Sequence, residues 1–406
     1  MTEQHDPYQA LRHREYRWFL LGSVPLFMAA QIQSLVMGWQ VYEITHDPLS
    51  LGLIGLAEAL PFLGVSLVGG WAADRWERRN LALISMAVLL VGAIVLLLLN
   101  LRQGPLFVWP FYWVQALAGF ARAFYRPASH ALSTQLIPRE SYQNAVTWRS
   151  SVFFSATVVG PALGGLLYSF GGPLLAYGTE AGFIGFSLFA MGRVRRRHRP
   201  AVPETSFTRS LVEGVGFVFS HRLILSTLSL DLFAVLFGGA VALLPAFAND
   251  VLHVGPRGLG LLRAAPALGG VLMSIVLAHW PQSRNTGKTL LYCVAAFGLT
   301  WIGFAWSTSF VLSWALLAAG GAFDNVSVVL RATLVQMKTP PEMMGRVQAI
   351  NGFFIGSSNE LGAFESGVAA RLFGLVPSVI FGACITLVVV AVTAWRVPEL
   401  RKLSRL

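Results

Sequence analysis

The chain has 406 residues, of which 55% are hydrophobic and only 12% are charged. That charged share is about half the usual ~25%, and a soluble protein of this composition would expose more apolar area than water tolerates. Disorder is excluded as well, because disordered chains are polar and poor in aromatic residues. Two cysteines, Cys293 and Cys384, are too few for a disulfide scaffold or a cysteine-built metal site. The composition predicts an integral membrane protein with many spans.

Helical spans account for this composition better than barrel strands. A spanning helix needs about 20 mostly apolar residues, and long runs such as 81–101 lack the polar–apolar alternation of a barrel strand. The predicted fold is therefore an all-α membrane protein with twelve transmembrane helices. The polar first 17 residues argue against a cleavable signal peptide. The predicted spans are 17–44, 50–72, 81–101, 106–125, 144–168, 173–193, 223–247, 258–279, 289–307, 310–330, 346–370 and 374–396.

Basic residues predict the orientation of these spans. With an even number of spans, both termini lie on one side, and that side holds all but four of the 30 lysines and arginines. The exceptions are Arg102, Arg257, Arg263 and Arg371. The positive-inside rule then places both termini in the cytoplasm. The net charge of +11 follows from this topology and from contact with anionic membrane lipids. Nucleic-acid binding is not expected, because the basic residues are spread over many short loops.

A hydrophilic stretch from Arg193 to Pro203 divides the chain into halves of six spans. We expect an N-terminal six-helix bundle (1–193), a cytoplasmic central loop (194–222) and a C-terminal six-helix bundle (223–406). Within the loop, an apolar residue recurs about every four positions, which predicts a short amphipathic helix on the membrane surface. The residues of this stripe are Phe207, Leu211, Val215 and Phe219.

The two halves resemble each other weakly at a shift of about 205 to 208 residues. LGLIGLAEALP from residue 51 parallels LGLLRAAPALG from residue 259. Internal repeats in a polytopic chain indicate a secondary transporter with its site between the repeats. The alternative is chance similarity between helices that are both rich in leucine and glycine.

The connection after the second span reads GGWAADRWERRN from residue 69 and resembles the signature of the major facilitator superfamily. One departure is a glutamate where the pattern prefers glycine. The resemblance implies two six-helix bundles around a central cavity and a conformational latch at this turn, in which Asp74 would bridge to an arginine. The alternative is an ordinary positively charged cytoplasmic loop. The matching residues are Gly70, Asp74, Arg75, Arg78 and Arg79.

The fifth span carries ATVVGPALGG from residue 156, which resembles the superfamily's antiporter motif. That motif is associated with exporters. A proline inside the helix kinks it, and the glycines give a small-residue face for close packing. Packing alone is the alternative explanation of these residues, Gly160, Pro161, Gly164 and Gly165.

Segments 121–140 and 330–350 resemble the drug and siderophore exporter branch of the superfamily. The enterobactin exporter and macrolide efflux proteins belong to that branch. Gln115 stands where related proton antiporters carry an arginine, and Arg122 and Arg126 lie further toward the cytoplasm. This departure weakens the case for proton coupling through the fourth span.

Seven acidic residues fall within the predicted spans. Each would cost about 2.5–3.5 kcal/mol at mid-bilayer, so they must face other helices, face water, be protonated or lie near an interface. Glu43 is expected at an interface, and Glu180 and Asp324 lie off the centre of their spans. A buried ion pair with Arg149 or Arg263 is the structural alternative for the others. The candidates for proton coupling are Asp231, Glu58, Glu365 and Glu360.

Polar and aromatic side chains in the spans that line the superfamily's cavity are candidates for substrate contact. Such a mixture suits a bulky amphipathic molecule. Hydrogen bonding between helices is the alternative for the polar members. The candidates are Gln33, Gln40, Trp39, Trp113, Gln115, Phe233 and Asn325.

The sequence lacks a nucleotide-binding P-loop and hydrolase or metalloprotease motifs, and its eight histidines lie outside the spans or at their ends. No cofactor, metal site or enzymatic activity is expected. We predict an inner-membrane, monomeric exporter of a small amphipathic molecule, drug-like or siderophore-like. It would work by proton antiport and alternating access. The alternatives are an uncoupled facilitator or lipid flippase of the same fold, and a membrane receptor or assembly factor without transport.

Overall fold

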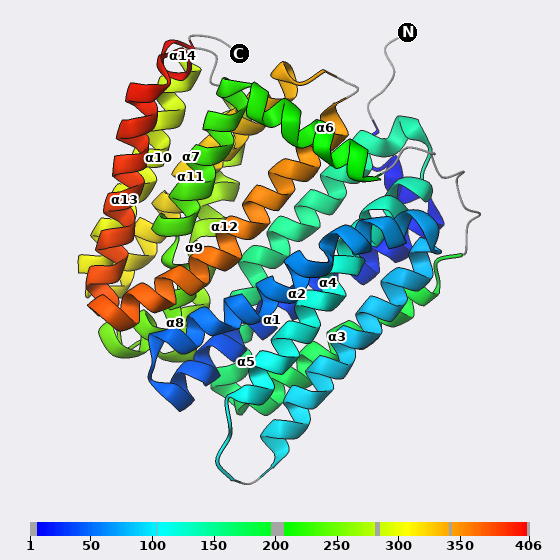
Figure 1. Cartoon of the computed structure of the whole chain (residues 1–406). Coiled ribbons are helices and arrows are strands. Elements are labelled where there is room, and N and C mark those ends of the chain that lie inside the picture. Colours follow the sequence, from blue (N-terminus) through cyan, green and yellow to red (C-terminus); the bar gives the residue numbers. More distant parts are fainter. Residues whose placement is uncertain (1–5, 103, 196–206, 281–284, 341–342, 404–406) are drawn as a thin grey trace. The chain divides into compact units, whose positions relative to one another are not determined.

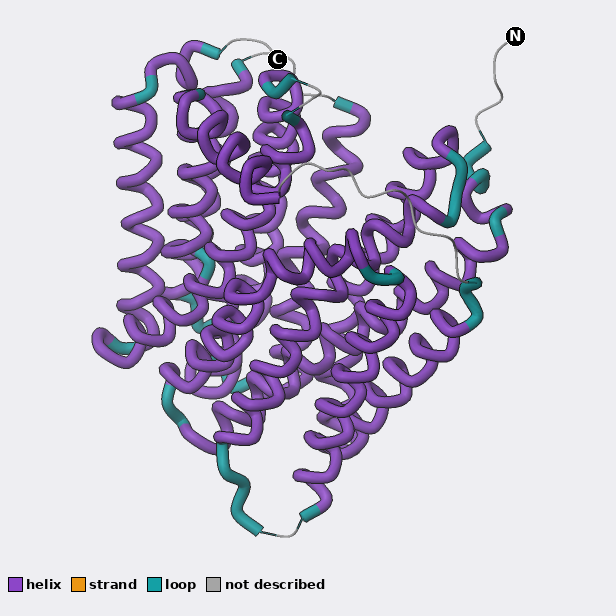
Figure 2. The backbone as a smooth tube through the Cα atoms, turned by 45° about the vertical axis from the view of Figure 1, so that its right-hand side comes forward, coloured by secondary structure: helices purple, strands orange, loops and turns teal. Residues whose placement is uncertain are grey.

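The computed structural model describes residues 6–102, 104–195, 207–280, 285–340 and 343–403. Throughout these ranges the chain forms helices joined by turns and short loops, and no strand occurs in them (Figure 2). The contacts within the chain define two compact units. The first consists of Met1–Ile44 and Ala57–Pro203, and the second of Thr45–Leu56 and Glu204–Leu406.

Helices of the first unit are named as in Figure 1. The second helix, α2, begins in the second unit and continues in the first. The elements are η1 (Ala10–Arg12), α1 (Arg14–Thr45), α2 (Pro48–Arg75), α3 (Arg78–Leu101), α4 (Trp109–Gln135), η2 (Arg139–Ser141) and α5 (Tyr142–Gly192).

The second unit contains the remaining elements (Figure 1). In it α10 packs against α11 and α13, and α12 packs against α6, α7 and α13. The elements are α6 (Phe207–Ser220), α7 (Arg222–Gly238), η3 (Ala240–Leu243), α8 (Leu244–Ala246), η4 (Phe247–Val251), α9 (Gly255–His279), α10 (Thr286–Trp306), α11 (Phe310–Lys338), α12 (Met344–Phe373), α13 (Leu375–Arg396) and α14 (Pro398–Lys402).

Within the described residues, nine helical segments are long and apolar enough to cross a membrane. The more polar helices α4 and α12 are outside this set. The 51-residue helix α5 is broken at Gly171 and Gly172, where Gly172 has a φ of 63° that favours glycine. It therefore covers two of the predicted spans, 144–168 and 173–193. The all-helical fold is confirmed, and the count of twelve spans stays a prediction.

The predicted span 223–247 lies within one candidate membrane span, Arg222–Val251, but its helix is interrupted. Helix α7 ends at Gly238, and three short helical pieces, η3, α8 and η4, follow it. Gly239 leaves the helical region with φ −96° and ψ 70°. Two successive glycines disfavour helix, and Pro245 cannot donate the hydrogen bond that would continue it.

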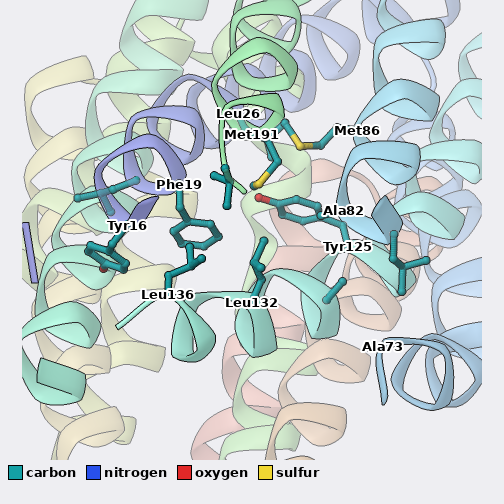
Figure 3. Packing of buried hydrophobic residues seen from close by; sticks show 14 of the residues in the cluster. Tyr16, Phe19, Leu26, Ala73, Ala82, Met86, Tyr125, Leu132, Leu136 and Met191 are labelled. Carbon is teal, nitrogen blue, oxygen red and sulfur yellow. The ribbon is translucent and has the colours of Figure 1, made fainter. Parts of the chain in front are cut away.

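The core of the first unit is a cluster of large apolar side chains from five helices (Figure 3). Tyr16 and Phe19 come from α1, Met86 from α3, Tyr125 from α4 and Met191 from the end of α5. Tyr125 points into the middle of the cluster in Figure 3. These contacts fix the lower-numbered end of α1 against the ends of the other helices.

Close backbone approach joins α2 to α4. A Cβ atom added to Gly69 would overlap the carbonyl group of Ala123, and one added to Gly119 would overlap the backbone of Glu58. Only glycine permits this separation of the two helices. The approach brings the polar residues of α2 and α4 within reach of one another.

The same kind of approach joins α9 to α11 in the second unit. A Cβ atom on Gly269 would overlap the carbonyl group of Ala318, and one on Gly321 would overlap the backbone of Pro266. Pro266 and Glu58 occupy corresponding positions of the repeated sequence segments. The repeat therefore corresponds to a repeated helix pair.

Helix α6 forms where an amphipathic helix is predicted, but the described part of its apolar stripe is not its packing face. Val215 and Phe219 are exposed, whereas Val218 is buried against α7 and α12. The side chains of Phe207 and Leu211 lie outside the described part of the structure. Gly214 contacts Ile350 of α12. The helix thus has two apolar faces, one of them packed on the second unit.

Several exposed tryptophans lie near helix ends. They are 70–74% exposed, a position typical of side chains at a membrane–water interface. This set comprises Trp109, Trp113, Trp280, Trp306 and Trp395.

We expect Gly269→Ala to destabilise the second unit by about 1–3 kcal/mol, because its methyl group would overlap the Ala318 carbonyl group. The adjacent Gly270→Ala is the control, since the nearest atoms to its Cβ position are 3.6 Å away or more. Thermal unfolding of both purified variants in detergent would measure the difference. Equal melting temperatures for the two variants would contradict the assigned contact.

Candidate functional site

Four polar side chains meet inside the first unit. Arg122 of α4 forms an ion pair with Glu58 of α2, and its Nη2 donates to the side-chain oxygen of Gln33, at 3.3 Å. Gln115 Nε2 donates to the other carboxylate oxygen of Glu58, at 2.5 Å. Gln33 and Gln115 are buried, and the Arg122 and Glu58 side chains are less than one-fifth exposed. The cluster is a charge-assisted network in which two side chains of α4 hold the carboxylate of α2, and α1 binds the arginine through Gln33.

The sequence of α4 places its members on one helix face. Gln115, Gly119 and Arg122 are spaced four and three residues apart, which is one turn each. Gly119 allows α2 to approach at Glu58, so the glutamate side chain lies between Gln115 and Arg122. The close helix contact and the ion pair therefore depend on each other.

A second polar group adjoins this cluster. Gln40 of α1 donates to the side chain of Asn100 of α3 and accepts from the Tyr177 hydroxyl of α5, at 3.0 Å. One turn from Tyr177, Glu180 is 1% exposed, and its Oε2 has no hydrogen-bond partner among the described residues. The charge of Arg122 acts on Glu180. Each of the helices α1 to α5 therefore contributes a polar side chain that bonds to another helix of the first unit.

The second unit contains its own buried ion pair, between Asp231 of α7 and Arg331 of α11. The two residues are 8% and 5% exposed. Asp324 lies seven residues before Arg331, two turns along the same helix face. The charges of both Asp231 and Arg331 act on Asp324. The adjacent Asn325 accepts a hydrogen bond from Ser274 of α9, at 3.1 Å.

Glu360 and Glu365 of α12 do not share these ion pairs. Both are partly buried. Glu360 lies near Gly55, whose ideal Cβ position is 3.9 Å from its Oε2. Within the described ranges Glu365 makes no hydrogen bond or ion pair with another side chain. Its carboxyl group is therefore held by packing alone.

For Glu58 and Asp231, the alternative of a buried ion pair with Arg149 or Arg263 is wrong. The structure assigns Arg122 to Glu58 and Arg331 to Asp231. The predicted spans ended at residues 125 and 330, which placed both arginines near the membrane surface. Helices α4 and α11 instead continue to Gln135 and Lys338, so Arg122 and Arg331 lie inside packed helices.

The predicted cavity residues divide into two groups. Gln33, Trp39, Gln40 and Gln115 are buried, and the three glutamines are hydrogen-bonded within the first unit. The second group lies outside this buried network and consists of two exposed aromatic residues and one partly buried polar residue. Phe233 is 41% and Trp113 is 74% exposed, and the partly buried Asn325 is bonded to α9.

The turn after α2, where a latch between Asp74 and an arginine is predicted, is exposed. Asp74 is exposed and makes no hydrogen bond or ion pair with a described residue, and Arg75 stacks on Trp71 at 4.6 Å. The next two arginines bind helix carbonyl groups. Arg78 donates to Ala73 and Ala131, and Arg79 donates to Gly192, at 2.7 Å.

Gly70 has open space at its Cβ position, so the glycine at which α2 packs on α4 is Gly69. The residues of the antiporter-like motif lie against α1. The Cβ position of Gly160 is 2.5 Å from the side chain of Gln31, and that of Gly164 is 3.3 Å from Ile32. Pro161 and Gly165 are buried beside them.

Comparison with known proteins places this architecture among transporters. The profile described as Major Facilitator Superfamily matches residues 19–363. The enterobactin exporters EntS of Shigella boydii serotype 18 and Shigella flexneri are each 26% identical over 396 residues, covering 95% of this chain and 94% of theirs.

Two solved structures show the same fold at low sequence identity. A bacterial homologue of the human lysosomal transporter Spinster, inward-facing and unoccupied, has a TM-score of 0.74 and 14% identity, covering 99% of both chains. The nucleoside transporter NupG has a TM-score of 0.70 and 15% identity, covering 94% of this chain and 98% of its own.

We expect Arg331→Met to destabilise the protein by about 3–5 kcal/mol, because it leaves the Asp231 carboxylate buried without its partner. Arg222→Met is the matched control, since Arg222 and its partner Glu399 are 63% and 61% exposed, and should change stability by about 0–1 kcal/mol. Unfolding in detergent measures both.

The double variant Asp231→Leu/Arg331→Met should recover part of the loss, because no charge is then left unpaired. If Arg331→Met and Arg222→Met are equally stable, the buried pair does not have the assigned role.

Proposed function

The chain belongs to the major facilitator superfamily, and on this premise we propose that it exports a small amphipathic molecule by proton antiport. The family is one of transporters and not of enzymes, and this chain is a multi-pass membrane protein. The observation that carries proton coupling is the acid–arginine chemistry buried in each unit, at Glu58 and Arg122 and at Asp231 and Arg331. Intramembrane ionisable residues of this kind are typical of proton relays.

We take the topology to be twelve spans with both termini in the cytoplasm. The bundles are residues 1–193 and 223–406, joined by the central loop 194–222, and the protein acts as a monomer in the inner membrane. Alternating access exposes the substrate first to one side and then to the other as the bundles rock. The exporter relatives and the basic residues on the cytoplasmic side support this arrangement.

Two observations support the proposed substrate class. The EntS relatives are named as exporters of enterobactin, and the antiporter-like residues Gly160 and Gly164 pack α5 closely on α1. Gln33 and Gln115 bind the ion pair and Gln40 binds Asn100 and Tyr177, which leaves the exposed aromatic residue Phe233 to contact a ligand. A siderophore-like or drug-like molecule with an aromatic face suits such a side chain.

Four acids are candidates for the proton carrier, and they differ in whether an arginine binds them. Glu58 and Asp231 are each bonded to an arginine, whereas Glu360 and Glu365 lie on α12 outside these pairs. An acid that exchanges a proton during transport must change partners between states. The ion-paired acids provide such a change if the arginine moves away from them.

An uncoupled facilitator or lipid flippase of the same fold is the second candidate. The exposed apolar residues of the helices favour contact with lipid in either case. The two candidates differ in whether substrate movement requires a proton gradient. Transport in proteoliposomes therefore separates them.

We expect compound-dependent proton movement in proteoliposomes that contain the purified protein and a pH-sensitive dye. The compounds to screen are catecholate siderophores and amphipathic drugs. Asp231→Asn should abolish proton movement, because the amide cannot carry the proton, and Glu365→Gln should do so only if that acid is the carrier. The exposed variant Glu43→Gln is the control. Compound flux without proton movement would overturn antiport in favour of the uncoupled candidate.

The Asp74 turn has its own test. If it latches one conformation, Asp74→Asn should slow transport several-fold without changing substrate affinity, because the residue makes no contact that folding requires. Glu140→Gln, an exposed acid outside the motif, is the control. An Asp74→Asn variant that transports at the unmodified rate would contradict the latch.

A further inference from the structure

An arginine stands one turn from an aromatic ring at the end of each of two neighbouring helices of the first unit. The guanidinium group of Arg193, the residue after α5, lies 4.7 Å from the ring centre of Phe189 and 6.0 Å from that of Trp18 of α1. The two rings meet edge to face, with their centres 6.4 Å apart. Arg14 stands four residues before Trp18, as Arg193 stands four residues after Phe189. We call these four residues the arginine–aromatic cluster.

Both arginines of the cluster lie at the same end of the helix pair, because α1 and the last part of α5 run in opposite directions. The carboxylate of Glu15 accepts a hydrogen bond from the backbone of Arg195 at 2.6 Å, whereas Gly22, two turns along α1, contacts Ala190 and Ser187. Both helices contain candidate membrane spans that extend to this end. The ends of spanning helices lie among the lipid headgroups, so the cluster lies at the membrane surface.

The guanidinium groups of the cluster are available to an anion. Arg14 and Arg193 are exposed, and neither side chain forms an ion pair or a hydrogen bond with a described residue. Stacking on the rings occupies a face of the Arg193 guanidinium group and leaves its N–H edge for bidentate contact with a phosphate. Glu15 follows Arg14 in the sequence but is bonded to Arg195. The cluster therefore offers two cations to a negatively charged group.

An apolar surface continues from the two rings along the same helices. The ring of Phe186, one turn before Phe189 on α5, lies 6.4 Å from it, and Leu21 lies one turn beyond the tryptophan on α1. These three side chains are 49–51% exposed. The other side of the same helix turns carries Phe19 and Met191, which belong to the buried cluster of Figure 3. A molecule bound here would meet cations at one end and apolar side chains along its length.

We propose that the arginine–aromatic cluster binds one anionic glycerophospholipid. Its phosphate group accepts hydrogen bonds from Arg14 and Arg193, and an acyl chain lies on Phe186 and Leu21. A zwitterionic headgroup suits the cluster less well, because its ammonium group would need a free carboxylate and Glu15 is already bonded to Arg195. The inference depends on the helices spanning a membrane, and not on the direction of transport or its coupling to protons.

Native mass spectrometry of the delipidated protein in detergent, titrated with phosphatidylglycerol, measures the affinity of the first bound lipid. Arg193→Gln and Arg14→Gln should each weaken it by about tenfold, because each variant loses charge-assisted hydrogen bonds to the phosphate. Arg139→Gln is the matched control, since it removes the same charge from an exposed arginine of η2 and should leave the affinity unchanged. Circular dichroism and size-exclusion chromatography identify folded variants.

Arg193→Lys distinguishes this site from a general attraction between basic residues and lipid. Lysine keeps the charge but lacks the planar fork that stacks on a ring and binds phosphate through two hydrogen bonds, so this variant should lose nearly as much affinity as Arg193→Gln. Phosphatidylcholine and phosphatidylethanolamine with the same acyl chains should bind the unmodified protein more weakly than phosphatidylglycerol does.

Equal phosphatidylglycerol affinity in the unmodified protein and in folded Arg193→Gln and Arg14→Gln would overturn the inference. An equal loss in Arg139→Gln would overturn it as well, because net charge alone would then explain the binding. Inorganic phosphate distinguishes a free anion from the lipid. If phosphate raised the unfolding temperature of the unmodified protein as much as phosphatidylglycerol, and did not do so in Arg193→Gln, the assignment to a lipid would be wrong. No shift with phosphate would support the lipid.

Discussion

Arginine keeps its charge in proteins, and inside an apolar helix bundle that charge needs a carboxylate at contact distance. Arg122 and Arg331 impose this requirement on their units. The first is met from α2 and the second from α7, so an ion pair links helices that are distant in sequence. The remaining polar groups are arranged around these pairs. Gln33 and Gln115 complete the hydrogen bonding of the first, and Asp324 lies two turns from the second.

The two units share a packing scheme but place their acids differently. Gly119 meets the backbone of Glu58, and Gly321 meets the backbone of Pro266, at corresponding positions of the repeat. Where the first half has an acid, the second therefore has a proline. The carboxylate that binds Arg331 comes instead from α7. Similar helix contacts thus support a buried ion pair that is assembled from different helices in each half.

Much of the fold could be predicted from hydropathy, because a bilayer-length apolar run has few alternatives to a helix. The glycine-rich segment of the fifth span was also informative, since small residues repeated at helical spacing indicate close packing. The ion pairs were not predicted. Charge was used to end the spans, so Arg122 and Arg331 were assigned to helix ends instead of to the interior. A search for arginines on the same face as a nearby acid or glycine would have detected both.

Periodicity was also insufficient for α6. The stripe that includes Val215 and Phe219 was correctly identified as apolar, but an apolar stripe does not specify whether lipid or protein covers it. The structure buries the neighbouring Val218 and leaves Val215 and Phe219 exposed. The same holds for the turn after α2. The motif identifies Asp74 in the sequence, but it does not specify which residues contact Asp74, because that depends on the tertiary structure.

The attachment of α6 has a mechanical consequence. Glu213 accepts a hydrogen bond from Arg346 of α12 at 2.5 Å, and Gly214 and Val218 pack on the same helix and on α7. Helix α6 is therefore held firmly against α12 and α7 of the second unit. A force applied to its exposed Val215 and Phe219, such as lateral pressure from lipid, would be transmitted to α12 through a short, stiff contact.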